Sequence, residues 1–442
     1  MKPIALRRWN WRGFDTKLPS RVFAIAAGEG TARLSNLLLA VFVSRTFGVR
    51  AAGAYALALA LSLYMMQGID FGLRHAGARM LGQEKANVAQ IVRFIQRRRI
   101  ALTLLIVVLG YCYGAAGPVP KDTRAIVSLY ALSIVGYGFS LDWMAWGMQR
   151  FLFMSGWRAL VSLLCTGVTI FAVQQFHTGM LILPLANALA YFVADSLLWL
   201  GWARKHVRMQ SPEATSVASL KMPDWKSTVL LGVALLVNQA FNSIDTMMLG
   251  SLTDSSETGL YSAAYRLLLL VLAIYYLVMQ AVYPQLAALP EKQRSFGVLR
   301  KPLTIAIAAG LGAAVVLGVS RGPLVELLYG RAFAPSAVLA GPLVFAIPLD
   351  FVTSLLITAL VAWDHPRRVL TATTTAVISN VALNCFLIPR YKAMGAAFAT
   401  PLSYLPYLAM LLWQMRQVST QKIYASDGIA ENAGSSPAEE RA

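Results

Sequence analysis

The stretch TVLLGVALLVNQAFNSIDTMMLG, residues 228–250, decides the fold because it contains only one charged residue, Asp245, in 23 positions. A helix of about 20 apolar residues is long enough to cross the roughly 30 Å hydrocarbon core of a bilayer. Apolar side chains lie on all sides of such a helix, which suits lipid rather than a water-facing surface. The stretch therefore predicts a transmembrane helix.

Eleven similar runs flank this one, and the whole chain is 57% hydrophobic and only 13% charged. A typical soluble domain has about 25% charged residues, so this composition excludes a soluble protein of the same length. We predict an all-α polytopic membrane protein with twelve transmembrane helices. They are placed near 22–44, 53–72, 100–117, 125–147, 157–174, 180–202, 228–250, 260–286, 303–320, 337–361, 369–388 and 394–415.

The net charge of +19 lies in short loops between these runs and not on one basic domain, which argues against nucleic-acid binding. Of the 39 Lys and Arg residues, 29 fall on one side of the predicted membrane, 8 on the other and two inside spans. The positive-inside rule then places both termini in the cytoplasm and predicts a bacterial inner-membrane protein. The expected order is a basic cytoplasmic N-terminus (1–21), an N-lobe (22–202), a cytoplasmic linker (203–227), a C-lobe (228–415) and a disordered cytoplasmic tail (416–442).

An internal repeat relates the two groups of six spans. A shift of 206 residues matches several positions without a gap, although chance similarity between Ala/Leu-rich helices is the alternative. Because six is an even number, both groups have the same topology, which predicts a parallel pseudo-repeat of two six-helix lobes around a central cleft. The clearest matches are Asn36 with Asn242, Gly53 with Gly259, and Tyr55 with Tyr261.

Polar residues recur at helical spacing on the first helix of each predicted lobe. Ionisable groups inside a membrane usually face a cavity or a partner, so we expect both stripes to line the cleft. The stripes are Glu29, Arg33 and Asn36 in the first lobe and Asn238, Asn242 and Asp245 in the second. Two simpler interpretations remain. In the first, Glu29 and Arg33 form a salt bridge within one helix; in the second, Asp245 and Arg266 form a salt bridge between neighbouring spans at the same depth in the membrane.

For the other polar and ionisable residues in the spans, the sequence predicts only a position or a local contact. Asp350 sits in the middle of a span, with Ser354 and Thr358 one and two turns later. Asp70 and Arg74, one turn apart at the inner end of a span, are expected to form a surface pair. Nearer the cytoplasmic ends, Asp142 and Asp195 are expected to be interfacial. For Asn380 and Asn384, hydrogen bonding between helices is the favoured interpretation.

The motifs of ATP-driven pumps and hydrolytic enzymes are missing from the sequence. It holds no G-x-x-x-x-G-K-[ST] loop, its four histidines are scattered, and no catalytic triad or carboxylate pair stands out. We expect a transporter and not an enzyme, with no bound cofactor. Its energy would come from an ion gradient, with H⁺ or Na⁺ as the coupling ion, or from product removal.

Three longer motifs resemble the polysaccharide transporter family, the O-antigen and exopolysaccharide repeat-unit flippases of the multidrug/oligosaccharidyl-lipid/polysaccharide exporter superfamily. They are 245–250, 257–266 and 384–400. Shorter matches occur at 28–30, 47–48 and 70–72. The resemblance implies a two-lobed fold, alternating access and a lipid-linked oligosaccharide as cargo. The family usually has Gly where this chain has Lys392.

On that basis we expect a flippase that moves a polyprenyl-diphosphate-linked oligosaccharide to the outer leaflet for surface polysaccharide or lipopolysaccharide synthesis. Arg33 and Arg266 would attract the diphosphate. Sugar hydroxyls would meet Asn36, Asn238 and Asn242, and the coupling ion would bind Glu29, Asp245 or Asp350. Membrane lipids and other polysaccharide assembly proteins are the expected partners. The alternatives are a multidrug and toxin extruder, a lipid II flippase, or a membrane enzyme such as a glycan polymerase.

Overall fold

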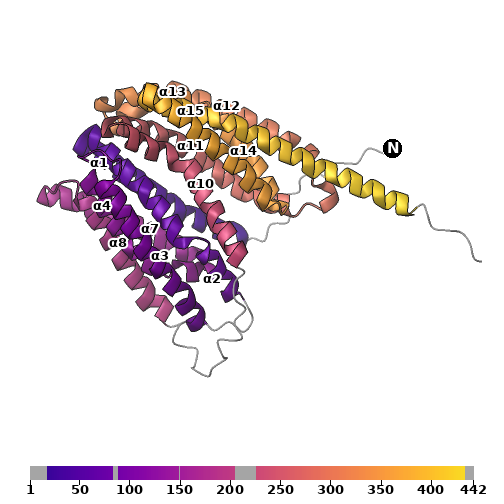
Figure 1. Cartoon of the computed structure of the whole chain (residues 1–442), viewed down its shortest axis with the longest axis horizontal. Coiled ribbons are helices and arrows are strands. Elements are labelled where there is room, and N and C mark those ends of the chain that lie inside the picture. Colours follow the sequence, from indigo (N-terminus) through magenta and orange to yellow (C-terminus); the bar gives the residue numbers. More distant parts are fainter. Residues whose placement is uncertain (1–16, 83–87, 149, 205–224, 434–442) are drawn as a thin grey trace, which may run out of the picture. The chain divides into compact units, whose positions relative to one another are not determined.

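The computed structural model describes residues 17–82, 88–148, 150–204 and 225–433, and every regular element among them is a helix (Figure 1). Its first half contains α1 (Lys17–Asp70), α2 (Leu73–Leu81), α3 (Val88–Ala116), α4 (Arg124–Ser133), α5 (Val135–Phe139), α6 (Asp142–Gly147), α7 (Phe151–Phe176) and α8 (Ile182–Leu198), followed by a π-helical turn, Trp199–Ala203. Its second half contains α10 (Trp225–Leu252), α11 (Ser255–Ala287), α12 (Phe296–Tyr329), α13 (Ala334–Leu343), α14 (Ala346–Ala362) and α15 (Pro366–Ala433). Short 3₁₀ turns at Glu291–Gln293 and Arg331–Phe333 flank α12.

Eight helices of the described chain are long and apolar enough to cross a membrane, or nine when α13 and α14, bent by 51°, count as one span. This confirms a multi-span helical membrane protein, whereas twelve spans stays a prediction. The number of apolar helices is lower than the number of predicted spans because α1 and α15 each cover two of the predicted spans. The predicted span 125–147 is divided among the short helices α4, α5 and α6.

Both double-length helices are broken at one residue. Gly48 breaks α1 with φ 81° and ψ −174°, a backbone conformation open to glycine because it has no Cβ. Lys392 breaks α15 with φ 50° and ψ −129°, which is unusual for a residue with a side chain. The predicted spans 22–44 and 53–72 leave a short gap that contains Gly48, and the structure confirms a break there.

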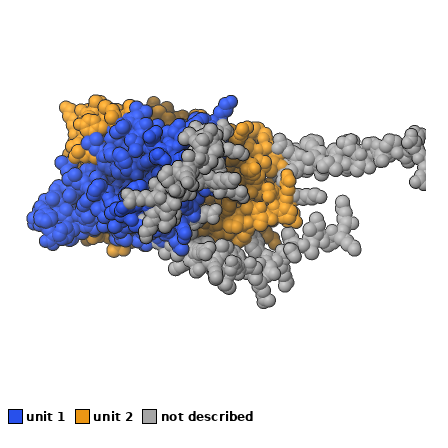
Figure 2. Space-filling model, turned by 90° about the horizontal axis from the view of Figure 1, so that it is seen from below, with its two compact units in different colours: residues 1–42, 69–107, 132–229 blue, residues 43–68, 108–131, 230–442 orange. Residues whose placement is uncertain are grey.

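The chain divides into two compact units (Figure 2). Unit 1 consists of 1–42, 69–107 and 132–229, and unit 2 of 43–68, 108–131 and 230–442. Two segments of the predicted N-lobe thus cluster with the C-terminal half, while the lobe boundaries and their repeat stay predictions. Most of the basic N-terminus and of the linker, and the last residues of the tail, lie outside the described residues.

The C-terminal tail departs from the expectation in one respect. We expected disorder, but the structure continues α15 as a helix to Ala433. Extending an existing helix costs far less than starting one, because each added residue gains a hydrogen bond. Polar composition alone is therefore a poor predictor of where a long helix ends.

Small residues let the helices of unit 2 approach closely. A Cβ on Gly53 would lie 1.7 Å from the Ser255 carbonyl oxygen and 2.7 Å from the Gly259 nitrogen. A Cβ on Gly259 would in turn lie 2.2 Å from the Val49 carbonyl oxygen. Gly53 and Gly259, matched by the 206-residue shift, therefore form a backbone-to-backbone contact between the second half of α1 and the start of α11.

Candidate functional site

Asp245 lies at the centre of a buried polar cluster in unit 2. Its residue is 5% exposed, and its Oδ2 accepts hydrogen bonds from Thr400 Oγ1 at 2.9 Å and Tyr261 Oη at 3.0 Å. Its Oδ1 accepts from Asn384 Nδ2 at 2.5 Å. The same Nδ2 also donates to Asn380 Oδ1 at 2.9 Å, which brings a fifth residue into the group. We call these five residues the Asp245 cluster.

The break in α15 makes this cluster possible. Asn384 precedes Lys392 and Thr400 follows it, yet both contact one carboxylate on α10. The four-residue spacing of Asn380 and Asn384 places them on the same face of the helix, one turn apart. The Asp245 carboxylate on α10 thus contacts α11 and both parts of α15, the part before the break and the part after it.

The Asp245 carboxylate has no ion-pair partner among the described residues. Among the ion pairs of the described residues, none involves Asp245, and its partners are hydroxyls and an amide. Asn384 Oδ1 is also buried and accepts no hydrogen bond within the described structure. A buried carboxylate normally acquires a proton or a cation, because an isolated charge is costly away from water. The cluster offers carboxylate, amide and hydroxyl oxygens, the ligands of hard cations.

Asp350 forms a smaller site on α14. Its Oδ1 accepts from Tyr404 Oη at 2.9 Å and its Oδ2 from Ser354 Oγ at 3.3 Å. The residue is half-buried, and the Ser354 contact matches the four-residue spacing noted in the sequence. Fewer partners hold Asp350 than hold Asp245, so Asp245 is the stronger candidate for ion binding.

The other predicted residues of unit 2 lie at its surface or partly exposed. Asn238 and Asn242 are exposed on α10, where Asn242 Nδ2 donates to the Asn238 carbonyl oxygen at 2.7 Å. Arg266 is half-buried, with its guanidinium 5.8 Å from the centre of the Tyr55 ring. It forms no ion pair with Asp245, so the Asp245–Arg266 interpretation was wrong.

The residues of the predicted stripe of unit 1 are exposed or half-buried, and its lining of a cleft stays a prediction. Glu29 pairs with Arg158 of α7 at 2.6 Å, and not with Arg33, which corrects the interpretation of a pair within one helix. Asn36 Oδ1 accepts from Ser162 Oγ at 3.0 Å, and both Arg33 and Asn36 are exposed. Because the two stripes belong to different units, a shared cleft stays a prediction.

A buried ion-pair cluster in unit 1 was missed. Asp70 and Arg74 were expected at the surface and Asp142 at the interface, but Asp70 and Asp142 are 3% and 2% exposed. Arg99, which falls between the predicted spans 53–72 and 100–117, is 0% exposed and lies 3.0 Å from Asp70, while Arg74 lies 3.0 Å from Asp142. The expectation was wrong because α3 begins at Val88 and carries Arg99 into the unit.

The partners of Asp245 were also missed as a group. Asn380 and Asn384 had been interpreted as helix-to-helix hydrogen-bonding residues, while Tyr261 had been noted only for the repeat. The available signal was the Asn pair at four-residue spacing, followed by Thr400 beyond a break. Sequence spacing cannot show which carboxylate such a pair contacts, since that depends on how α15 folds back.

Comparisons with known proteins agree on the fold. The lipid II flippase MurJ, in an inward closed conformation, superposes with a TM-score of 0.72 over 91% of each chain at 12% identity. Probable flippase AglR of Haloferax volcanii is 28% identical over 174 residues, 38% of this chain and 36% of that protein. Probable low-salt glycan biosynthesis flippase Agl15 of the same organism is 24% identical over 234 residues, 50% and 47%. The chain thus spans less than half the length of these two relatives.

The fold defines a polytopic helical membrane protein with a buried polar site in unit 2. Residues 20–289 match the family described as polysaccharide biosynthesis protein, which is more than half of the chain. The chain belongs to this family.

Proposed function

We propose that the chain is a flippase that moves a polyprenyl-diphosphate-linked oligosaccharide from the cytoplasmic to the outer leaflet by alternating access. Membership of the polysaccharide biosynthesis family is the single observation that carries this proposal, and two of the relatives are named as probable flippases, one of them in glycan biosynthesis. The diphosphate and sugars cannot cross hydrocarbon unaided, because desolvating charged groups is very costly. A polar passage replaces the lost water while the polyprenyl tail stays in lipid.

Arg33 and Arg266 are the proposed diphosphate-binding residues. Arg33 is exposed and Arg266 half-buried, so neither guanidinium is sealed in the protein core. An arginine presents a rigid fork of donors that suits phosphate oxygens. Asn36, Asn238 and Asn242 are exposed as well and offer amides to sugar hydroxyls.

The Asp245 cluster is the proposed site of the coupling ion, either H⁺ or Na⁺. A cation there would bind groups from α10, α11 and both parts of α15 at once. It would favour the conformation in which these helices are close, and its release would favour the other. A ligand shifts a conformational equilibrium only through such a difference in affinity.

The test is transport of a fluorescent polyprenyl-diphosphate oligosaccharide in proteoliposomes, with leaflet location read by quenching from outside. Arg33→Ala and Arg266→Ala should each slow transport, whereas Arg300→Ala, an exposed position on α12, serves as the matched control. Full transport by both variants at wild-type protein levels would remove the diphosphate role. Transport of an organic cation instead of the glycan lipid would favour the multidrug extruder.

A lipid II flippase is the second candidate, an alternative that the sequence left open. The superposition of MurJ over 91% of the chain, at 12% identity, shows the fold alone and does not choose between the two cargoes. Competing the labelled oligosaccharide with lipid II in the same vesicles separates the two cargoes. Preference for lipid II would overturn the repeat-unit proposal and leave the transport mechanism in place.

A further inference from the structure

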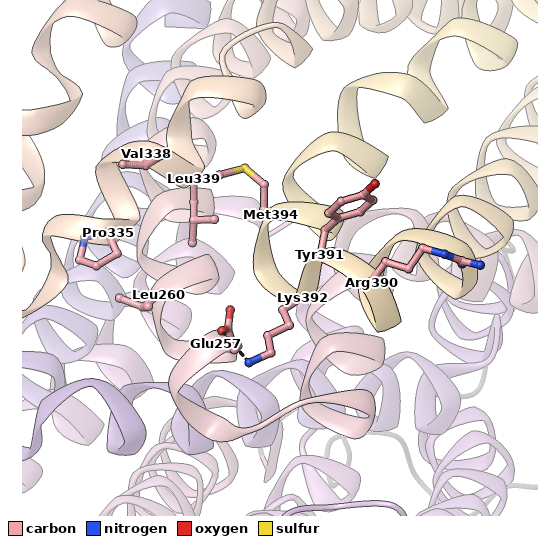
Figure 3. A pocket seen from close by; sticks show the side chains of 9 residues that line it. All are labelled: Glu257, Leu260, Pro335, Val338, Leu339, Arg390, Tyr391, Lys392 and Met394. Carbon is pink, nitrogen blue, oxygen red and sulfur yellow. Dashed lines mark ion pairs between the residues drawn. The ribbon is translucent and has the colours of Figure 1, made fainter.

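Unit 2 contains a pocket of about 450 Å³ where the start of α11, the start of α13 and the break in α15 meet (Figure 3). This volume lies within the range of small-molecule sites. Figure 3 shows one wall made of aliphatic side chains and a polar side at the α15 break. The aliphatic wall is formed by Leu260, Pro335, Val338, Leu339 and Met394.

The polar side of the pocket already holds an anion, the carboxylate of Glu257. Its Oε1 lies 3.7 Å from Lys392 Nζ, and its Oε2 accepts a hydrogen bond from the Ala393 N–H at 3.2 Å. Ammonium groups and backbone amides at the start of a helix are also the groups that bind phosphate. The carboxylate therefore marks a position where an anionic oxygen is stabilised.

The ammonium of Lys392 at this side remains accessible to a ligand. The Lys392 side chain is 61% exposed and that of Glu257 is 25% exposed, so their ion pair is partly open to solvent. An exposed pair of this kind contributes little to stability and is easily exchanged for another partner. Arg390 also lines the pocket, but Figure 3 shows its side chain pointing away from Lys392, and its Nη1 donates to the Phe386 carbonyl oxygen at 2.9 Å.

The backbone at Lys392 gives a second reason to regard this charge as functional. Its φ of 50° and ψ of −129° would be relaxed by glycine, yet the chain places a lysine there. Strained residues of this kind gather at ligand sites, where the surrounding structure holds them.

We infer that this pocket binds an alkyl phosphate, with the phosphate on Lys392 and the Ala393 N–H and the alkyl chain along the aliphatic wall. Glu257 occupies the phosphate position when the pocket is empty and gives it up on binding. The same chemistry is offered by a membrane phospholipid and by the polyprenyl phosphate carrier. This inference concerns binding only and does not depend on the proposed transport.

The experiment measures binding to the purified full-length protein in phosphatidylcholine nanodiscs. The probes are a short-chain phosphatidylglycerol, a polyprenyl phosphate and inorganic phosphate, added in separate titrations. Lys392→Gly should weaken binding of both lipid probes about tenfold, because it removes a charge-assisted contact, whereas Arg390→Gln should leave their affinities unchanged. Glu257→Gln should tighten binding several-fold, since a neutral amide competes less for the ammonium. Lys301→Gln, exposed on α12, is the matched control.

The thermal unfolding midpoint serves as the control for correct folding. Lys392→Gly should leave this midpoint unchanged or raise it, because glycine relaxes the backbone strain at the break in α15. Tighter binding of the polyprenyl phosphate identifies the carrier as the ligand, and tighter binding of phosphatidylglycerol identifies membrane lipid. An unchanged affinity in Lys392→Gly would overturn the site. So would inorganic phosphate that binds as tightly as the lipids, because the aliphatic wall would then contribute nothing.

Discussion

The buried ion pair between Arg99 and Asp70 supports the sharpest stability prediction. Arg99 is 0% exposed, and its Nη1 donates to the Ser140 carbonyl oxygen at 2.6 Å while its Nη2 lies 3.0 Å from Asp70 Oδ1. Replacing it in Arg99→Met keeps the aliphatic length and removes the charge. Asp70 then keeps Tyr137, which donates at 2.6 Å, and Arg74 at 3.9 Å.

Breaking one partner of a buried pair costs about 3–5 kcal/mol, because the remaining charge lacks compensation. Two partners remain near Asp70, so the lower end, about 3 kcal/mol, is expected for Arg99→Met. The unfolding midpoint in detergent micelles, followed by tryptophan fluorescence, should fall by about 5 °C or more. Arg93→Met is the matched control, since Arg93 is exposed on the same helix and donates only to Ala89 one turn away.

The double variant Asp70→Asn/Arg99→Met decides whether charge is the cause. Replacing both ions by neutral groups is often nearly neutral, so the double variant should be more stable than Arg99→Met alone. A double-mutant cycle then gives a favourable coupling energy of about 2 kcal/mol. Purely additive losses would refute the reasoning and assign the effect to packing.

Three further predictions concern unit 2. Asp245→Asn should abolish the dependence of transport on the coupling ion, measured as uptake with and without a Na⁺ or H⁺ gradient; retained dependence would exclude the site. Asn384→Ala should weaken the apparent affinity for that ion about tenfold, since it removes one oxygen ligand, and an unchanged affinity would contradict this. Gly53→Ala should destabilise the protein by about 1–3 kcal/mol, because its Cβ meets backbone. Gly312→Ala is the control, with no atom within 4 Å of its Cβ, and equal midpoints would count against the close contact.

Much of the helical architecture could be predicted from the sequence, because hydropathy reports directly on what lipid accepts. The break beside Gly48 was also expected, since short turns favour glycine. The break at Lys392 divides two predicted spans, but its backbone geometry could not be read from residue type. A lysine there gives no signal of positive φ.

The site was less predictable, for a reason that differs between residues. Asp245 was identified because a charge inside an apolar run is conspicuous. Its partners Asn384 and Thr400 are common membrane residues, and their meeting depends on how one helix folds back on itself. Arg99 was misplaced because a run of arginines suggests water, whereas only two of its neighbours, Arg93 and Arg97, are exposed.

The break in α15 has a consequence for how motion can spread through unit 2. Asn384 and Thr400, sixteen positions apart, touch the two oxygens of one carboxylate. Any rotation of the early part of α15 against its later part must therefore stretch one of these contacts. A single proton or metal ion bound at Asp245 would in this way control the angle between the two parts of α15, and with it a much larger movement of the helix ends.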